Sequence, residues 1–103
     1  MEEPLAVKIL LDLSAGLKAI HDLGVAHLDI KTENCLIDAS TNMKISDFGI
    51  SLFVDEEGME SKYPVRGTRC WMSPELLSQP PILTTKSDIW GLGCVMYHVC
   101  TIV

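Results

Sequence analysis

The chain has 103 residues, enough for one small domain but not for two. Apolar residues make up 48% of it and charged residues 21%, which is the balance of a globular protein and excludes a disordered one. The net charge of −6 argues against a nucleic-acid-binding surface and gives no support for an anionic membrane as a partner.

The first predicted element is an amphipathic helix over residues 4–23. Pro4 suits the first turn of a helix, and Gly24 suits the position just past its end. We expect His21 to lie at a solvated helix end. The apolar residues that recur at spacings of three and four, and so form the predicted buried face, are Ala6, Ile9, Leu10, Leu13, Leu17 and Ile20.

A short strand at 25–26 and a β-hairpin follow the helix. The hairpin consists of apolar runs at 35–37 and 43–45 around a polar turn. Asn34 precedes its first strand and Asp47 comes soon after its second, so antiparallel pairing brings them to one open end. Both side chains offer hard oxygen ligands of the type that Mg²⁺ takes when it also binds phosphate.

Two further polar side chains, Asp29 and Lys31, lie just upstream of Asn34. An acid can position or deprotonate a hydroxyl, and a cation can contact phosphate oxygens. Together with the two metal ligands they make up half of a phosphoryl-transfer site.

The second half of the chain is predicted to contain a long loop and two helices. Residues 50–69 read as a loop, and loops of this length are usually functional. Ser73 is a good N-cap for a short helix over 73–77, which the prolines at 80 and 81 would end. Residues 89–103 carry no full charge, so the last helix is either a membrane span, which needs about 20 apolar residues, or a helix buried on all sides.

Three motifs in this order resemble the catalytic core of a eukaryotic protein kinase. Residues 27–34 read His-Leu-Asp-Ile-Lys-Thr-Glu-Asn, residues 47–49 read Asp-Phe-Gly, and residues 73–75 read Ser-Pro-Glu. The resemblance covers nearly all of the chain. It also matches Ser-Asp-Ile-Trp-x-x-Gly at 87–93 with the central buried helix of that family, which favours a buried helix over a membrane span.

The resemblance implies a role for each candidate site residue. Asp29 matches the aspartate that receives the substrate hydroxyl, and Lys31 matches the lysine that contacts the transferred phosphate in serine/threonine kinases. Thr68 would bond toward both. Asn34 and Asp47 would bind Mg²⁺ and, through it, ATP.

The remaining matched residues have structural roles in the family. Leu36 matches the apolar residue under the adenine ring; it can also be a simple core leucine, and the two interpretations are compatible. The other implied supports are His27 packing under Phe48, the Gly49 that completes its motif, Glu75 pairing with an arginine absent from this sequence, and Asp88 bonding to the backbone of the catalytic loop.

Leu28 stands where the family usually has an arginine that pairs with a phosphate on the activation segment, here residues 50–69. Leucine cannot pair with phosphate, which puts activation by this route in doubt. Ser61 and Tyr63 are further hydroxyls in that segment. Arg66 and Arg69 are either cations of the site or solvated loop charges.

The cysteines indicate a reducing compartment. No C-x-x-C pair occurs, and no cysteine has a neighbouring set of zinc ligands. Residues 2 and 3 are both glutamate, so no signal peptide is visible. We therefore expect an intracellular, cytoplasmic protein.

The expected fold is α+β and protein-kinase-like. Residues 1–103 form a partial kinase domain, a mostly helical fragment of the C-terminal lobe with a short β-hairpin at the catalytic loop. The expected function is ATP- and Mg²⁺-dependent transfer of the γ-phosphate to protein serine or threonine hydroxyls. The glycine-rich loop and the strand lysine of the family have no counterpart here, so the chain alone is expected to be inactive. The alternative is a non-catalytic kinase-like module that binds a regulatory partner of unknown identity.

Overall fold

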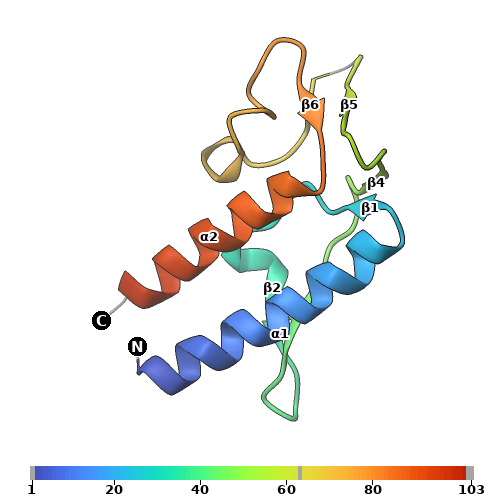
Figure 1. Ribbon diagram of the computed structural model, residues 1–103. Helices are drawn as coiled ribbons and strands as arrows, with labels where there is room; N and C mark the ends of the chain where they lie inside the picture. Colours follow the sequence, from blue (N-terminus) through green and yellow to red (C-terminus); the bar gives the residue numbers. More distant parts are fainter. Residues whose placement is uncertain (1, 63, 102–103) are drawn as a thin grey trace.

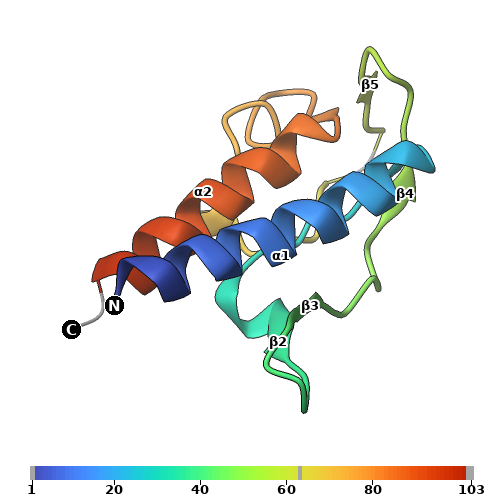
Figure 2. The same ribbon diagram turned by 60° about the horizontal axis from the view of Figure 1, so that its bottom comes forward.

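The computed structural model describes residues 2–62 and 64–101. Two helices, α1 (Glu3–Asp22) and α2 (Lys86–Thr101), lie side by side and run in opposite directions, so that the start of α1 and the end of α2 are at the same end (Figures 1 and 2). The helices hold 20 and 16 residues, and the rest is loops, short 3₁₀ turns and strands of two or three residues. The α+β class is confirmed, but the chain is less helical than expected.

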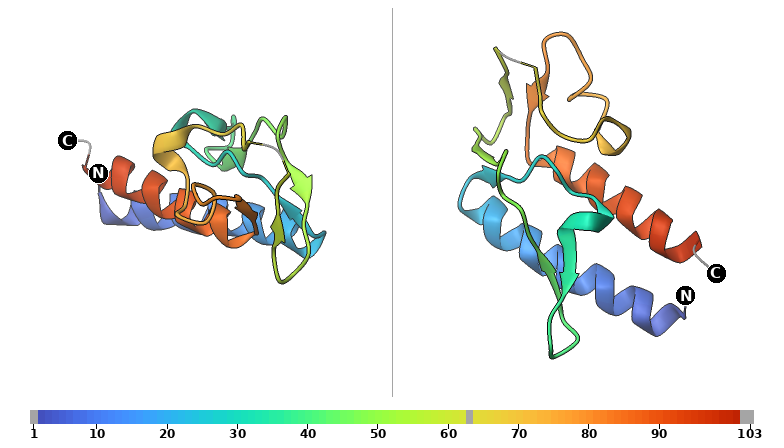
Figure 3. Two further views of the ribbon diagram at one scale, coloured as in Figure 1. Left: turned by 90° about the horizontal axis from the view of Figure 1, so that it is seen from above. Right: turned by 180° about the vertical axis from the view of Figure 1, so that it is seen from behind.

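Three small antiparallel sheets pair strands that are mostly distant in sequence. The predicted strand β1 (Val25–Ala26) pairs with β4 (Leu52–Phe53). The predicted hairpin is β2 (Cys35–Ile37) with β3 (Met43–Ile45), and it lies across α1 (Figure 3). The third sheet joins β5 (Met59–Glu60) to β6 (Ile82–Leu83). Because β4 and β5 are two residues long and have remote partners, residues 50–69 showed no strand pattern and were predicted to be loop throughout.

Helix α1 was predicted nearly to the residue, but one residue of its predicted buried face is exposed. Ile9, Leu13 and Leu17 are buried, whereas Leu10 is 40% exposed, so its placement on the buried face is wrong. Leu10 points in nearly the same direction as the buried Leu17, about 20° away around the helix, so its exposure comes from its place nearer the start of α1 and not from its direction. At the end of α1, the Gly24 N–H donates to the His21 carbonyl at 2.9 Å, and the chain turns out of the helix.

The core consists of two clusters that meet at the loop between β1 and the 3₁₀ turn η1 (Thr32–Asn34). The first cluster joins α1 to α2 and includes Ile30, Leu92 and Val95. The second lies under residues 50–69 and includes Leu28 and Leu83. Leu28 and Ile30 of this loop thus pack in different clusters. Asp29, which lies between them, is held at the boundary of the two clusters.

Helix α2 is not buried on all sides in the described structure. Leu92 and Val95 are buried against α1, but Ile89 and Trp90 are about half exposed and Tyr97 is 75% exposed. The expectation of a helix covered all round is therefore wrong for these residues, since only one of its faces packs on the rest of the chain. No helix among residues 2–62 and 64–101 is long and apolar enough to cross a membrane.

The predicted short helix at 73–77 is a single hydrogen-bonded turn. The Leu76 N–H donates to the Ser73 carbonyl at 3.1 Å, and the Leu77 N–H lies 3.3 Å from the same carbonyl and 3.1 Å from that of Pro74, after which the chain leaves the helical path. The Ser73 hydroxyl donates to the Ser87 hydroxyl at 3.1 Å, which ties the start of this turn to α2. The Ser78 hydroxyl lies 2.6 Å from the Glu75 carbonyl and 2.8 Å from that of Pro80, and this local bonding competes with helix formation.

Candidate functional site

The structure brings Asp29, Lys31 and Thr68 together from two segments nearly forty residues apart. Lys31 Nζ donates to Thr68 Oγ1 at 2.7 Å and lies 3.8 Å from Asp29 Oδ1. The backbone N–H of Thr68 donates to the same Asp29 oxygen at 3.4 Å, and its hydroxyl lies 3.5 Å from it. One carboxylate, one ammonium and one hydroxyl therefore share a small region, where they can hold an incoming hydroxyl and a phosphate oxygen.

Asn34 adjoins this group and is oriented by it. Its amide Nδ2 donates to the Asp29 carbonyl at 2.8 Å and lies 3.4 Å from Asp29 Oδ2. The Asn34 side chain is buried, and its Oδ1 is left as the atom for a metal ion. The η1 turn that carries it ends at Asn34, whose carbonyl accepts the Ser46 N–H at 2.8 Å.

Asp47 follows Ser46 directly, so the bond between Ser46 and Asn34 brings both predicted metal ligands to one end of the hairpin. Asp47 has φ of 58°, a left-handed conformation that is uncommon for residues other than glycine. Its Oδ1 accepts the Gly49 N–H at 3.3 Å, and its side chain is exposed. The donor set of one amide oxygen and one carboxylate fits Mg²⁺, which usually takes few protein ligands and fills its sphere with water and phosphate oxygens.

His27 is fully buried and both of its ring nitrogens are occupied. The Asp29 N–H donates to Nδ1 at 3.1 Å, so Nε2 carries the proton that is donated to the Ser46 carbonyl at 2.8 Å. The Phe48 ring meets the His27 ring edge-on, with centroids 4.8 Å apart. His27 thus joins the Asp29 loop to the segment that carries Asp47, and it has no nitrogen free for proton transfer.

Asp88 anchors the same loop from the start of α2. Its carboxylate is 1% exposed and accepts the backbone N–H groups of His27 at 2.8 Å and Leu28 at 2.9 Å. His21 Nε2 lies 2.8 Å from Asp88 Oδ2, so the interpretation of His21 as a solvated helix end is wrong. The sequence held no signal for this contact, because His21 and Asp88 are 67 residues apart.

Glu75 finds a partner other than the expected arginine. The Ser87 hydroxyl lies 3.2 Å from Glu75 Oε1 and also accepts from Ser73. This chain of bonds joins the turn at 73–77 to the first turn of α2. Ser87 was predicted only as the first residue of the motif at 87–93, and nothing in the sequence indicated its bond to Glu75.

Leu28 and Leu36 have very different surroundings. Leu28 is buried in the second core cluster and has φ of 70°. Leu36 is 52% exposed beside the hairpin end, so the interpretation of Leu36 as a core leucine is wrong. Arg66 and Arg69 are both exposed, which fits solvated loop charges. Tyr63 lies outside the described residues.

Charged and thiol groups near the site have shifted pKa values with clear causes. The Thr32 hydroxyl, which donates to Glu33 at 2.9 Å, is the first cause of the lowered pKa of Glu33, and the charges of Lys31 and His98 add to it. Burial raises the pKa of the Cys35 thiol to about 11. Among the described residues, no group of three or more histidine, cysteine or acidic side chains could hold a metal ion.

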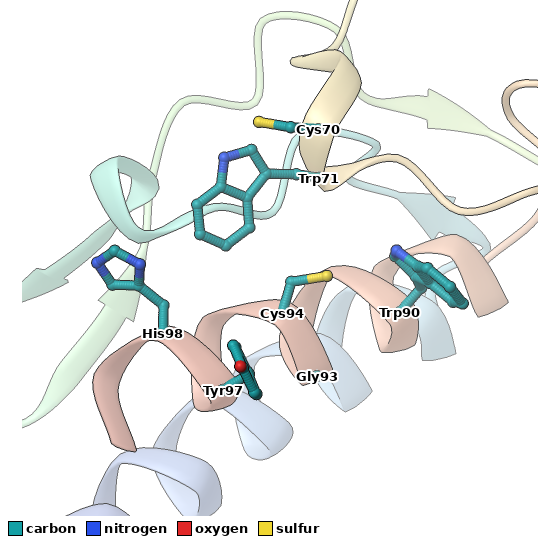
Figure 4. Close-up of a pocket in the computed structure, with 7 residues that line it drawn as sticks. All are labelled: Cys70, Trp71, Trp90, Gly93, Cys94, Tyr97 and His98. Atoms are coloured by element: carbon teal, nitrogen blue, oxygen red, sulfur yellow. The ribbon is translucent and has the colours of Figure 1, made fainter. Parts of the chain in front are cut away.

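An open pocket of about 540 Å³ lies beside the site, between α2 and the 3₁₀ turn η2 (Arg69–Trp71). Figure 4 shows the Trp71 ring over one end of the pocket and Trp90 at the other. His98 is exposed, and its ring is tilted against that of Trp71 with ring centroids 6.1 Å apart. The full lining is Cys70, Trp71, Trp90, Gly93, Cys94, Tyr97 and His98.

The amino-acid sequence is similar to those of known protein kinases. Residues 1–102 match the model of the protein kinase domain. The chain is 40% identical over 100 residues to the mitogen-activated protein kinase kinase kinase bck1 of Aspergillus fumigatus, and 38% identical over 98 residues to the serine/threonine-protein kinase BCK1/SLK1/SSP31 of Saccharomyces cerevisiae. It is 40% identical over 91 residues to the human serine/threonine-protein kinase Nek5.

These matches cover most of the chain but little of the relatives. They include 95%, 95% and 87% of the chain in the order given, and 6%, 7% and 13% of the length of the three relatives.

Proposed function

The chain belongs to the protein kinase family, and from that premise we propose that it forms part of the C-terminal lobe of an ATP- and Mg²⁺-dependent protein serine/threonine kinase. The observation that carries the proposal is the 2.7 Å bond between Lys31 and Thr68, with Asp29 next to both. It brings the activation segment onto the catalytic loop at the point where a substrate hydroxyl and a phosphate would meet.

Asp29 is the residue that receives the substrate hydroxyl. Its Oδ1 faces Lys31 and Thr68, and its Oδ2 lies toward Asn34. A hydroxyl that donates to this carboxylate is aligned for attack and gives up its proton as the new bond forms. Lys31 places a positive charge beside the same oxygen, where it stabilises the negative charge on the transferred phosphoryl group.

Asn34 and Asp47 would hold the metal ion through their side-chain oxygens. When bound, Mg²⁺ neutralises charge on the phosphate oxygens of ATP. The chain's own contribution is to fix the two ligands, Asn34 through its bond to Asp29 and Asp47 through the Ser46 bond that closes the hairpin end. Leu36, exposed beside the hairpin, is positioned to offer an apolar surface to the adenine ring.

Leu28 makes the activation segment independent of phosphate pairing at this position. Its side chain packs in the cluster with Ala26, Leu76 and Leu83, against which Ile50 and Val65 of the segment are also packed. Burial of apolar surface stabilises by about 25 cal/mol per Å², so this contact can hold the segment without a charged partner.

The test uses the full-length protein that carries this sequence. Asp29→Asn should reduce phosphate transfer to a serine/threonine substrate by at least about a thousandfold while leaving the affinity for Mg·ATP within about twofold, since removing a catalytic base or positioning acid acts on the transition state. Asp47→Asn should lower both transfer and Mg·ATP affinity. Asp22→Asn, which changes an exposed carboxylate on α1, is the matched control.

The two variants separate the assigned roles. Equal loss of nucleotide affinity in Asp29→Asn and Asp47→Asn would contradict them. A wild-type protein that binds a partner but transfers no phosphate, with magnesium and ATP in excess, would favour the non-catalytic alternative.

A further inference from the structure

Gly67 brings the activation segment into backbone contact with the loop on one side of Asp29. A Cβ built on Gly67 would lie 2.8 Å from the Leu28 carbonyl oxygen and 3.2 Å from the end of the Met72 side chain. The first distance is too short for a carbon–oxygen contact, so any residue other than glycine would have to push the segment away from Leu28. Thr68, the next residue, is the one that bonds to Lys31 and approaches Asp29.

Gly91 brings α2 into contact with the loop on the other side of Asp29. A Cβ at this position would lie 2.8 Å from Ile30 Cβ and 3.0 Å from the Ile30 carbonyl oxygen. Both atoms are fixed, because Ile30 is buried in the first core cluster and its β-branched side chain is stiff. Gly91 is itself buried, whereas Gly93 is exposed and a Cβ there would meet no atom within 4 Å.

We propose that Gly67 and Gly91 are positioning residues that hold Asp29 from opposite sides, through Leu28 and Ile30. The proposal rests on the proposed function, in which Asp29 receives the substrate hydroxyl. Neither glycine touches the reacting atoms. Each acts by the absence of a side chain, which allows a neighbouring element to approach the residue before or after Asp29.

The surroundings of Asp29 make this double contact effective. Leu28 has a left-handed backbone, and its N–H is held by Asp88 on α2. Because the loop is fixed at this point, a displacement of Leu28 or Ile30 also displaces Asp29. Misplacement of a catalytic group by about 1 Å can reduce a rate about a hundredfold.

Alanine substitutions in the full-length protein test the proposal. Gly67→Ala and Gly91→Ala should each lower kcat about tenfold or more while raising KM for ATP less than Asp47→Asn does, because Asp47 is held by the hairpin end and not by Leu28 or Ile30. Gly93→Ala is the matched control in the same helix. It should leave kcat unchanged and not lower the melting temperature, since alanine is the better helix former.

A double-mutant cycle separates positioning from general destabilisation. If Gly67 acts by positioning Asp29, then Gly67→Ala should reduce kcat at least about fivefold less in an Asp29→Asn background than in the wild type. Independent effects that multiply in the double variant would overturn the proposal for Gly67. For Gly91, a loss of kcat no larger than that of Gly93→Ala would overturn it.

Hydrogen–deuterium exchange supplies a measurement that does not depend on catalysis. Gly67→Ala and Gly91→Ala should speed exchange in residues 26–31 at least about fivefold relative to Gly93→Ala, since both open contacts of that loop. If the wild-type protein transfers no phosphate, the proposed function fails. The hydrogen–deuterium exchange rates of residues 26–31 then decide by themselves whether Gly67 and Gly91 hold this loop in place. Equal exchange in all three variants would then refute it.

Discussion

Replacing Asp88 with asparagine would remove the charge from a carboxylate that is 1% exposed and has three N–H partners. A hydrogen bond to a charged acceptor contributes about 1.5–3 kcal/mol and a neutral one about 0.5–1.5 kcal/mol. The asparagine can accept through only one side-chain atom, so its NH₂ group would face a backbone donor of His27 or Leu28. An unsatisfied buried donor costs about 1–3 kcal/mol, and the total loss should be about 3 kcal/mol.

The assay is urea unfolding of the full-length protein, with hydrogen exchange in residues 25–31 to assign the transition to this part of the chain. With a dependence of about 2 kcal/mol per molar urea, the midpoint should fall by about 1.5 M. Asp22→Asn is the control, because its bond to Lys18 at 2.7 Å joins two exposed side chains and contributes at most about 1 kcal/mol. A loss for Asp88→Asn no larger than that of this control would refute the reasoning.

Three further predictions concern side chains around the site. The Cys35 thiol, with its pKa raised by burial to about 11, should react with iodoacetamide at pH 8 more slowly than the exposed Cys70, as measured by mass spectrometry. The thiol of Cys35 has its ordinary pKa of 9.0 in the unfolded state, so it loses its proton at a lower pH there than in the folded state. The contribution of Cys35 to the free energy of unfolding should therefore be lost as the pH rises from 9 toward 11. The pKa of Asp12 is lowered, first by its bond with Lys8 and then by the Met43 N–H, so hydrogen-exchange protection of the hairpin should fall as pH drops below about 4 and the carboxylate takes a proton. Ser61→Ala should leave most of the transfer rate of the full-length protein, because the apolar contact of the activation segment needs no phosphate; a large loss rescued by Ser61→Asp would contradict this.

The local elements followed from the sequence because their causes are local. The long first helix has apolar residues at helical spacing, and the hairpin has two apolar runs around a polar turn. The candidate site could also be predicted, since Asp29, Lys31 and Asn34 lie within six residues of one another and Asp47 follows the hairpin. The roles of these residues stay predictions until the variants are measured.

The errors have a common physical origin in contacts between distant segments. The short strands β4 and β5 depend on β1 and β6, and the turn at 73–77 is tied to Ser87 on α2. His21 was assigned to solvent because nothing near it in sequence needs a polar partner.

The sequence by itself determined which residues can do chemistry, because residue type and spacing decide which groups a loop or hairpin end presents. Only the tertiary structure decided how these groups are held. The Asp88 carboxylate fastens the loop at Leu28, and the bare backbones of Gly67 and Gly91 approach it on either side of Asp29. Such close approaches depend on how two remote backbones pack, and a glycine in a sequence does not reveal which carbonyl its missing side chain would meet.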